Sequence, residues 1–575
     1  MHFSWLAITV SLSNIALYNL TIAALAQSPP PDVTIPPDVP ETIEQTIPKL
    51  PDSFPPLIRE SPATIPKPRL QTPDTSPSPE INISDSERFL IKKVEIIGST
   101  VLQAEIAELI KPIENNRVTF EQLLQLRSQI TQLYLDNGYV TSGAFLLNNQ
   151  PLSSGIVQIK VVEGKLEQIN IAGLNRLRSN YVRQRLANAR ETPLNRQELE
   201  KALQLLQLNP LIAVVNAELS AGSTPGSNIL EMKLTEAPAF STGITVANSQ
   251  SPSIGSAQAS LGFGHDNVLG FGDSLRAEYG ITEGLDLYNI NYTLPVNGRN
   301  GTINLRHSSG DSVILEERFR DLDIESKTQT FSLSFRQPLA RSPEKEFAVS
   351  LALDLRRQQT FIEGNTFSFQ EGGPEDGNSK MTVIRFSQDW LDRNAQRVFA
   401  ARSQFSFGIN AFDATITDSR TDGQFFSWIG QFQWVQRLSP RTVLLAKVGT
   451  QLTPDSLLSL EKFGMGGVGT VRGYRQNQLV ADNGILGSIE VRIPLTSNPR
   501  RLQLVPFFDI GTVWNNSDTD PNPGTIAGLG VGLNWLIGSD WDLRLDYGIP
   551  LIKTDDQGNS LQDKGLYFSL HYQPF

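Results

Sequence analysis

The ten residues Asp540–Ile549, DWDLRLDYGI, decide the fold of this chain because apolar and polar side chains alternate along them. The apolar set is Trp541, Leu543, Leu545, Tyr547 and Ile549, and the polar set is Asp542, Arg544 and Asp546. Successive side chains of a β-strand point to opposite faces, so the stretch predicts a strand with one apolar and one charged face. A soluble sheet turns its apolar face inward, whereas a membrane barrel turns it toward lipid and keeps the charges in the lumen.

The same alternation recurs over residues 239–575, for example in the stretches 347–355, 426–434 and 566–572. About 16 such segments can be placed, an even number, and many have the length that a tilted strand needs to cross a bilayer. Aromatic residues recur toward the segment ends, as the interfacial girdles of a membrane barrel require. We therefore predict a transmembrane β-barrel of about 16 antiparallel strands, since a soluble adhesin would explain the strands but not the inverted pattern.

Composition narrows the possible functions. The chain of 575 residues has no cysteine and four scattered histidines, which excludes thiolate metal sites, cysteine nucleophiles and disulfides. A formal net charge of −11 argues against general nucleic-acid binding. Serines are plentiful, but no G-x-S-x-G elbow stands near a histidine, so hydrolase chemistry is not indicated. We expect no enzyme activity, no metal or other cofactor, and neither nucleic acid nor nucleotide as a partner.

A long connection, residues 453–483, falls between the eleventh and twelfth predicted strands and contains Phe463–Tyr474, FGMGGVGTVRGY. Gly464, Gly466 and Gly469 match the dinucleotide fingerprint G-x-G-x-x-G, but no amphipathic helix follows them, which argues against that interpretation. Two alternatives stay open for the connection. It is either a surface loop with an incidental arginine or a segment that folds into the lumen.

Arg472 is the cation of this glycine-rich stretch, and a buried cation needs a carboxylate partner. Asp509 is a candidate because it shares its strand face with Phe507 and Gly511, which places all three in the predicted lumen. Glu490 is predicted to be lumenal as well and therefore competes with Asp509 for the arginine. We expect the loop to enter the lumen and to dock through this ion pair.

The strand that follows Asp509 offers room for such a docked loop. Gly528, Gly530 and Gly532 share one face, which is also predicted to point into the lumen. Because glycine has no side chain, these positions would let the loop approach the barrel wall closely.

The N-terminal part of the chain predicts export followed by a spacer. Residues 1–26 are mostly apolar and end in Ala24-Leu25-Ala26, which suits cleavage of a signal peptide. The alternative is an uncleaved membrane anchor, because no lysine or arginine precedes the apolar stretch. Residues 27–87 are rich in proline and predict an extended linker.

Residues 88–164 and 165–238 repeat each other loosely, with a period of about 75 residues. Ile91–Gly98, IKKVEIIG, matches Leu166–Gly173, LEQINIAG, so each opening strand ends at a glycine. Two amphipathic helical stretches and two further strands follow in each repeat. We predict two small α+β domains in tandem, each with the order β-α-α-β-β.

Taken together, these features resemble the outer-membrane transporters of two-partner secretion, the haemolysin-activator and filamentous-haemagglutinin transporter family. That family belongs to the wider superfamily of barrel-assembly insertases. The family signatures V-R-G-[YF] and F-x-D-x-G are matched by Val471, Arg472, Gly473 and Tyr474, and by Phe507, Asp509 and Gly511. The repeats resemble polypeptide-transport-associated (POTRA) domains, with family-like phrases YLDNGYVTS at 134–142 and VVEG at 161–164.

The resemblance implies two periplasmic POTRA domains, a barrel in the cell outer membrane and the export of one large, β-helical exoprotein. The lipid bilayer is the other expected partner. The POTRA domains would bind the unfolded exoprotein in extended form, and small sheets accept such a chain by adding it to an exposed edge. The segment 156–162 is the expected edge, with Ile156, Gln158, Lys160 and Val162 as its contact residues.

Two alternative functions stay open. A barrel-assembly insertase shares the architecture but usually carries more POTRA domains, and a diffusive porin leaves the repeats unexplained. Members of the resembled family often carry an N-terminal helix that plugs the pore. The residues before Phe89 are dense in proline and hold no long helical pattern, so we expect a plug that is short or missing.

Overall fold

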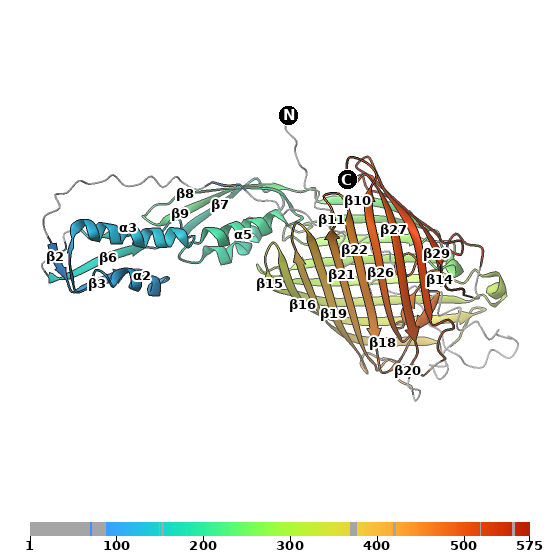
Figure 1. Cartoon of the computed structure of the whole chain (residues 1–575). Helices are drawn as coiled ribbons and strands as arrows, with labels where there is room; N and C mark the ends of the chain where they lie inside the picture. The colour runs from blue at the N-terminus through green and yellow to red at the C-terminus, as the bar shows by residue number, and fades with distance from the viewer. Residues whose placement is uncertain are drawn as a thin grey trace. The chain divides into compact units, whose positions relative to one another are not determined.

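The computed structural model describes residues 69–71, 88–148, 150, 154–368, 377–417, 421–517, 519–554 and 558–574. The predicted signal peptide, residues 1–26, lies outside the described residues, and so does the expected linker, residues 27–87, apart from a short strand at 69–71. The described chain forms two compact units, one ending at Ala237 and the other beginning at Pro238 (Figure 1). Among these residues, no helix has both the length and the apolar character needed to span a bilayer.

The first unit contains a small α+β domain with a three-stranded sheet in the order β3-β6-β5 and a two-stranded sheet, β2-β4. Its elements are β2 (Arg88–Ile91), β3 (Lys93–Ile97), α2 (Gln103–Ile110), β4 (Asn116–Thr119), α3 (Phe120–Asp136), β5 (Gly143–Leu146) and β6 (Ile156–Val162). Helix α3 begins with a capping box, in which Thr119 and Gln122 each accept a hydrogen bond from the other's backbone N–H. Its buried residues recur at the spacing of one helix face and are Leu123, Leu126, Ile130 and Tyr134.

The phrases YLDNGYVTS and VVEG meet in this domain through a hydrogen bond between Tyr134 and Glu163. The Tyr134 hydroxyl lies 2.9 Å from a Glu163 carboxylate oxygen, and burial raises the pKa of Tyr134 to about 12, so the hydroxyl stays a donor. Glu163 also accepts hydrogen bonds from the backbone N–H and the hydroxyl of Thr100, each at 2.7 Å. The carboxylate therefore ties the end of β6 to the connection before α2.

A second α+β domain follows, with the sheet order β1-β8-β9-β7. Its elements are β1 (Arg69–Gln71), β7 (Lys165–Ala172), α4 (Ser179–Arg185), η2 (Ala187–Arg190), α5 (Arg196–Gln207), β8 (Ile212–Ala221) and β9 (Ser227–Glu236). The side chain of Asn195 caps α5, whose buried residues Leu199, Leu203 and Leu206 face the sheet core. The edge strand β1 comes from the proline-rich segment.

The expected contact edge at 156–162 is wrong, because β6 is the central strand of its sheet. It pairs in parallel with β3 from Lys93↔Ile156 and antiparallel with β5 from Gly143↔Val162. Its backbone is therefore paired on both sides and cannot accept another strand. Ile156, Gln158, Lys160 and Val162 share one face of the strand instead. Alternation in the sequence indicates on which face of a sheet each side chain lies. It does not indicate which strands lie side by side, because that order depends on contacts between segments far apart in the chain.

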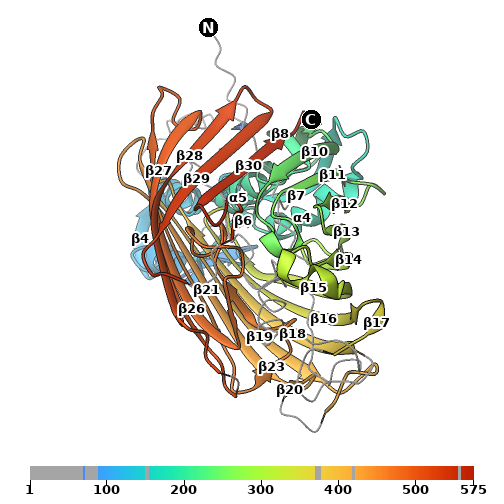
Figure 2. The same ribbon diagram turned by 90° about the vertical axis from the view of Figure 1, so that its right-hand side faces the viewer.

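The second unit is a closed antiparallel barrel, which confirms the predicted fold class. Within the part of the chain that the structure describes, sixteen long strands form the ring, and the two-residue β17 (Asn365–Thr366) pairs antiparallel with the end of β16. The long strands are β10 (Phe240–Ala247), β11 (Gln258–Asp266), β12 (Ser274–Ile281), β13 (Leu285–Pro295), β14 (Thr302–Val313), β15 (Glu325–Arg341), β16 (Lys345–Ile362), β18 (Asn378–Arg393), β19 (Arg397–Ile409), β21 (Phe426–Arg437), β22 (Val443–Leu452), β26 (Asn483–Pro494), β27 (Leu502–Trp514), β28 (Thr525–Ile537), β29 (Trp541–Pro550) and β30 (Leu566–Tyr572). β30 lies between β29 and β10, where the ring closes (Figure 2).

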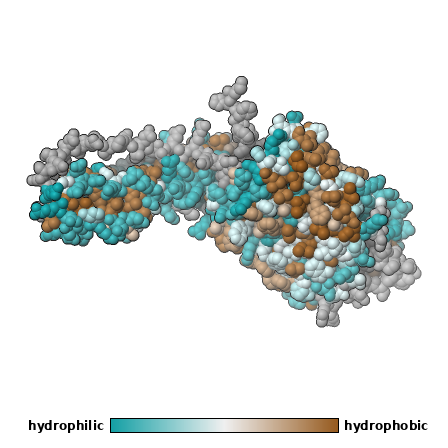
Figure 3. Space-filling view, in the orientation of Figure 1, coloured by the Kyte–Doolittle hydropathy of each residue, from teal (hydrophilic) through white to brown (hydrophobic). Residues whose placement is uncertain are grey.

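The outer surface of the barrel is apolar, as the inverted pattern predicts. Leu529 and Ile549 are 49% and 48% exposed, whereas Asp546 on the opposite face of β29 is 2% exposed. Hydrophobic residues gather on the outside of the strands in the space-filling view (Figure 3). A band of this kind is stable only where lipid replaces water, so the barrel spans a membrane.

A charge on this outer band is expected to destabilise the barrel. Leu529→Arg should lower the free energy of unfolding in lipid vesicles by about 2–4 kcal/mol, because a guanidinium must leave water for hydrocarbon. Urea unfolding followed by tryptophan fluorescence measures the change. The matched control is Phe145→Arg on β5, which is 53% exposed in the small soluble domain and should leave barrel stability unchanged. Equal stability of the Leu529→Arg variant and the wild type would contradict a lipid-facing band.

Candidate functional site

The candidate site is the connection between β22 and β26, which folds back into the barrel. It contains β23 (Ser456–Leu457), β24 (Phe463–Met465) and β25 (Leu479–Ala481), and β24 and β25 pair as a small antiparallel hairpin. Buried apolar side chains of the loop pack against the wall residues Leu486, Val513 and Ile526; the loop members are Phe463, Met465, Val471, Tyr474, Leu479 and Ala481. The loop is thus a folded element with its own contacts to β26, β27 and β28.

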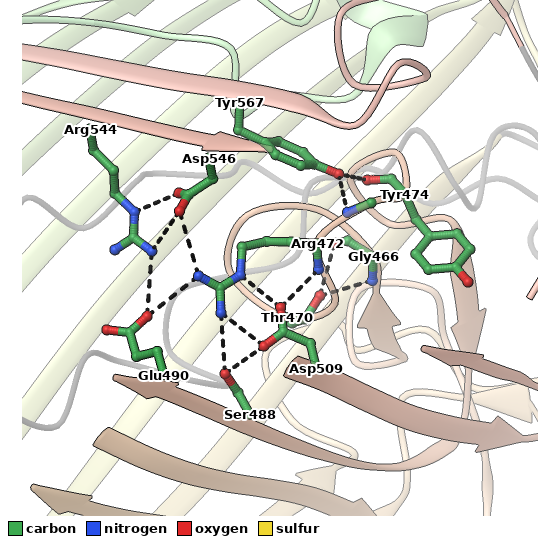
Figure 4. A network of polar contacts seen from close by, with 11 residues as sticks. Gly466, Thr470, Arg472, Tyr474, Ser488, Glu490, Asp509, Arg544, Asp546 and Tyr567 are labelled. Carbon is green, nitrogen blue, oxygen red and sulfur yellow. Dashed lines mark hydrogen bonds and ion pairs between the residues drawn. The ribbon is translucent and has the colours of Figure 1, made fainter. Parts of the chain in front are cut away.

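Arg472 and Asp509 form a bidentate ion pair at the centre of this contact (Figure 4). Nε of Arg472 lies 2.7 Å from Oδ2 of Asp509, and Nη2 lies 2.9 Å from Oδ1. The backbone N–H of Arg472 donates to the same carboxylate at 3.1 Å. The guanidinium also lies over the ring of Phe507, 3.5 Å from its centroid. Arg472 is 3% exposed and Asp509 0%, so each charge depends on the other for compensation.

Glu490 lies farther from Arg472 than Asp509 does, with Nη1 and Oε2 separated by 3.4 Å. Its stronger contact is to Arg492, at 2.8 Å. Asp546 lies 3.6 Å from Nη1 of Arg472 and pairs with Arg544 at 2.6 Å. The geometry therefore makes Asp509 the main partner, while Glu490 and Asp546 complete a shared network of charges on β26, β27 and β29.

The strand register of the barrel explains why the loop docks beside Asp509. Asp509 lies beside Ser488 on one neighbouring strand and beside Gly528 on the other. The Ser488 hydroxyl donates to Asp509 at 2.6 Å and so orients the carboxylate. A Cβ atom at Gly528 would overlap the carbonyl oxygen of Arg472, and one at Gly548 would lie 2.5 Å from the backbone nitrogen of Gly473. The loop backbone rests where the wall has no side chains.

Gly530 and Gly532, the other two glycines predicted to make room for the loop, face different neighbours. A Cβ at Gly530 would overlap the carbonyl oxygen of Tyr547 and the ring of Phe507, and a Cβ at Gly532 would overlap the carboxylate of Asp546. These two positions make room for other residues of the wall, and Gly528 is the one of the three that touches Arg472.

Gly473 and Tyr474 complete the docking motif. Gly473 has a φ of +104°, a backbone conformation that favours glycine, and its N–H donates to the Tyr567 hydroxyl at 2.8 Å. The Tyr567 hydroxyl donates in turn to the Tyr474 carbonyl at 2.6 Å. The Tyr474 hydroxyl lies 2.8 Å from the carbonyl oxygens of Ala527 and Ile552. Tyr567 has no sequence signal of its own beyond its place on the polar face of the last strand.

A second contact holds the loop to a different part of the wall, and sequence reasoning missed it. Glu461 forms a bidentate pair with Arg385, with distances of 2.8 Å and 3.1 Å, and also pairs with Arg356. Nε of Arg385 contacts Asp354 at 2.6 Å. These wall residues lie on β16 and β18, which β19, β21 and β22 separate from β26 in the ring. Alternation along the strand places Asp354 and Arg356 on the lumenal face. Nothing in the sequence, however, links them to Glu461.

Comparison with known proteins covers most of the chain. The family model described as haemolysin secretion/activation protein ShlB/FhaC/HecB matches residues 226–535, and that of the ShlB-type POTRA domain matches residues 89–164. The chain is 22% identical over 486 residues to the outer membrane transporter CdiB of Dickeya dadantii (strain 3937), covering 79% of this chain and 81% of the relative. It is 23% identical over 508 residues to the heme/hemopexin transporter protein HuxB of Haemophilus influenzae (strain 86-028NP), covering 83% and 86%. The solved structure of CdiB from Escherichia coli matches with a TM-score of 0.67 and 22% identity, covering 91% of this chain and 95% of that one.

Adding one methyl group at the contact should release the loop from the wall. Gly528→Ala is expected to expose the loop amides to hydrogen–deuterium exchange, because its Cβ would overlap the Arg472 carbonyl. A roughly tenfold faster exchange of residues 463–474 corresponds to about 1.4 kcal/mol of lost docking free energy. The matched control is Gly469→Ala in the loop itself, where a Cβ would meet nothing within 4 Å. Unchanged exchange in Gly528→Ala would show that this contact does not hold the loop.

Proposed function

The chain belongs to the haemolysin secretion/activation protein family ShlB/FhaC/HecB, and we propose that it carries an unfolded partner exoprotein across the outer membrane. The barrel is an outer-membrane barrel, and the POTRA domains are periplasmic in this family. The partner would bind first to the POTRA domains and then pass through the barrel to the cell surface. The proposal extends to this chain the transport activity for which CdiB and HuxB are named.

The observation that supports this function best is a loop that non-covalent contacts hold inside the lumen. The Arg472–Asp509 pair holds the loop against β26–β29, and the Glu461 contacts hold its earlier part against β16 and β18. We propose that this seat keeps the loop out of the route of the moving polypeptide. A loop released from the seat would lie in that route and obstruct it.

Partner recognition is proposed for the free edge of the first POTRA sheet. Among the described residues, β5 pairs with one strand, β6, and on its other side the Ala144 N–H donates to the Thr131 hydroxyl of α3 at 3.0 Å, a contact that an added strand would replace. Phe145 on this strand is 53% exposed and offers an apolar contact to an incoming chain. An extended segment of the partner would add to β5 through backbone hydrogen bonds, which demand little of its sequence.

We further propose that the chain catalyses no reaction and that the partner is large and β-helical. An unfolded chain that folds on the outer side of the membrane cannot return through the lumen without unfolding. Its folding free energy would therefore bias the direction of transit without nucleotide hydrolysis.

A capture experiment tests the proposed function directly. The full-length protein in detergent micelles is mixed with the denatured secreted proteins of its own cell and, separately, with unfolded outer-membrane proteins. We expect selective capture of one large secreted protein, because a transporter needs to recognise one partner. Broad capture of unfolded barrels with no selective secreted protein would indicate a barrel-assembly insertase instead.

Removal of the docking cation should weaken export. Arg472→Ala is expected to reduce export of the captured partner roughly tenfold or more while the barrel still inserts, because Asp509 then lacks its buried partner and the loop loses its seat. Export is measured as partner protein in the medium, and barrel insertion by resistance to urea extraction. Arg441→Ala, on the exposed turn between β21 and β22, is the matched control and should export normally. Export at the wild-type level by an Arg472→Ala, Asp509→Ala double variant would contradict a role for the pair.

A further inference from the structure

The second POTRA domain carries a run of arginines without any acidic residue among them. No aspartate or glutamate occurs from position 168 to position 190, and this stretch holds five arginines, Arg176, Arg178, Arg183, Arg185 and Arg190. The whole chain, in contrast, has a formal net charge of −11. The run is thus a local cationic segment in an acidic protein, and such segments attract anionic surfaces.

Three of these arginines lie around the start of α4. Arg176 and Arg178 flank Leu177, which is 3% exposed and belongs to the domain core, so the two arginines lie on the outside and are exposed. Arg183 is exposed as well. Its Nη1 donates to the Ser179 hydroxyl at 2.8 Å, which turns the guanidinium back toward the start of the helix. We call Arg176, Arg178 and Arg183 the arginine patch.

Glu236 fixes the patch at the end of the domain from which the chain continues into the barrel. Its carboxylate accepts hydrogen bonds from the backbone N–H groups of Asn175, Arg176 and Leu177, at 2.8, 2.9 and 2.8 Å. Glu236 is the last residue of β9, and three residues separate it from Phe240, where β10 begins. A chain of that length spans at most about 14 Å, so the patch is tethered closely to the first strand of the barrel.

This tether favours one anionic surface as the partner of the patch. The POTRA domains are periplasmic in this family, so the chain enters the outer membrane from the periplasmic side at β10. The surface at that point is the periplasmic leaflet of the membrane, where phospholipids present their phosphates. Arginine binds phosphate through a planar fork of N–H donors, and clusters of basic residues next to a membrane recognise anionic headgroups.

We propose that the arginine patch binds the headgroups of anionic phospholipids in the periplasmic leaflet and so holds the second POTRA domain at the membrane surface. The inference goes beyond the proposed transport function and does not depend on it. An acidic segment of the exported polypeptide is the competing occupant. The leaflet is favoured because the three-residue connection keeps it within reach of the patch at all times, whereas a free polypeptide has to be captured first.

The test uses the full-length protein in lipid nanodiscs, with a polarity-sensitive nitrobenzoxadiazole dye attached at Asn180→Cys. Asn180 is exposed on α4, and the natural chain has no cysteine, so the dye has a single attachment site next to the patch. Its emission increases when it moves from water to a membrane interface. Emission is compared between nanodiscs of phosphatidylcholine alone and nanodiscs in which part of the lipid is phosphatidylglycerol.

We expect the emission to rise at least about twofold with phosphatidylglycerol, because the patch then draws α4 to the anionic surface. The rise should disappear in an Arg176→Gln, Arg178→Gln, Arg183→Gln variant, and it should also disappear at high salt, which screens the headgroup charges. Lysine at the same three positions keeps the charge and should keep the rise, which separates loss of the cations from a folding defect.

The matched control removes three exposed cations of the first POTRA domain, in an Arg88→Gln, Lys92→Gln, Arg117→Gln variant. It has the same change in net charge and should respond to phosphatidylglycerol like the labelled parent. Equal emission in the two kinds of nanodisc, or an undiminished rise in the glutamine variant of the patch, would overturn the inference. Weaker capture of the exported partner by that variant, without any response to phosphatidylglycerol, would assign the patch to the polypeptide and overturn it as well.

Discussion

The bidentate contact between Arg472 and Asp509 is the interaction on which the arrangement inside the barrel depends. Both groups are almost fully buried, so the loss of either would leave the other without its main counter-charge. The backbone N–H of Arg472 adds a third hydrogen bond to the same carboxylate, which fixes the loop backbone as well as the side chain. The pair therefore sets the position of the whole docking motif, and the contacts of Gly473 and Tyr474 follow from it.

The residues of the barrel wall around Asp509 leave space for the loop that carries Arg472. Asp509 lies in register with Gly528, so the carboxylate and the place without a side chain lie next to each other. A side chain at either Gly528 or Gly548 would push the loop away from the carboxylate that holds it. The cluster of Glu461 with Arg356 and Arg385 secures the earlier part of the same loop on β16 and β18. The loop is thus held at two separated places by ion pairs that are strong because they are buried and that can exchange without breaking a covalent bond.

The sequence predicted those features that follow from strand periodicity. Alternation placed Asp509, Phe507 and Gly528 on the lumenal face, and the need of a buried guanidinium for a carboxylate paired Arg472 with Asp509, with Glu490 as a competing partner. The same reasoning failed for the edge at Ile156, because periodicity carries no information about which strand lies beside which. It also missed Glu461, Arg356 and Tyr567, whose contacts join segments far apart in the chain through the closed ring. The residues that would answer whether a plug helix precedes the POTRA domains lie almost entirely outside the described part of the chain.

The most direct test of the account measures where the loop lies with and without the ion pair. Spin labels are attached at Gly469→Cys in the loop, where a side chain has space, and at Ser539→Cys in the exposed turn between β28 and β29, in the protein reconstituted into lipid vesicles. Pulsed electron paramagnetic resonance then gives the distribution of distances between the two labels. The account predicts one narrow distribution for the protein with Arg472 and Asp509 intact and a broad distribution after Asp509→Ala. An equally narrow, unshifted distribution in the Asp509→Ala variant would contradict the claim that this pair seats the loop.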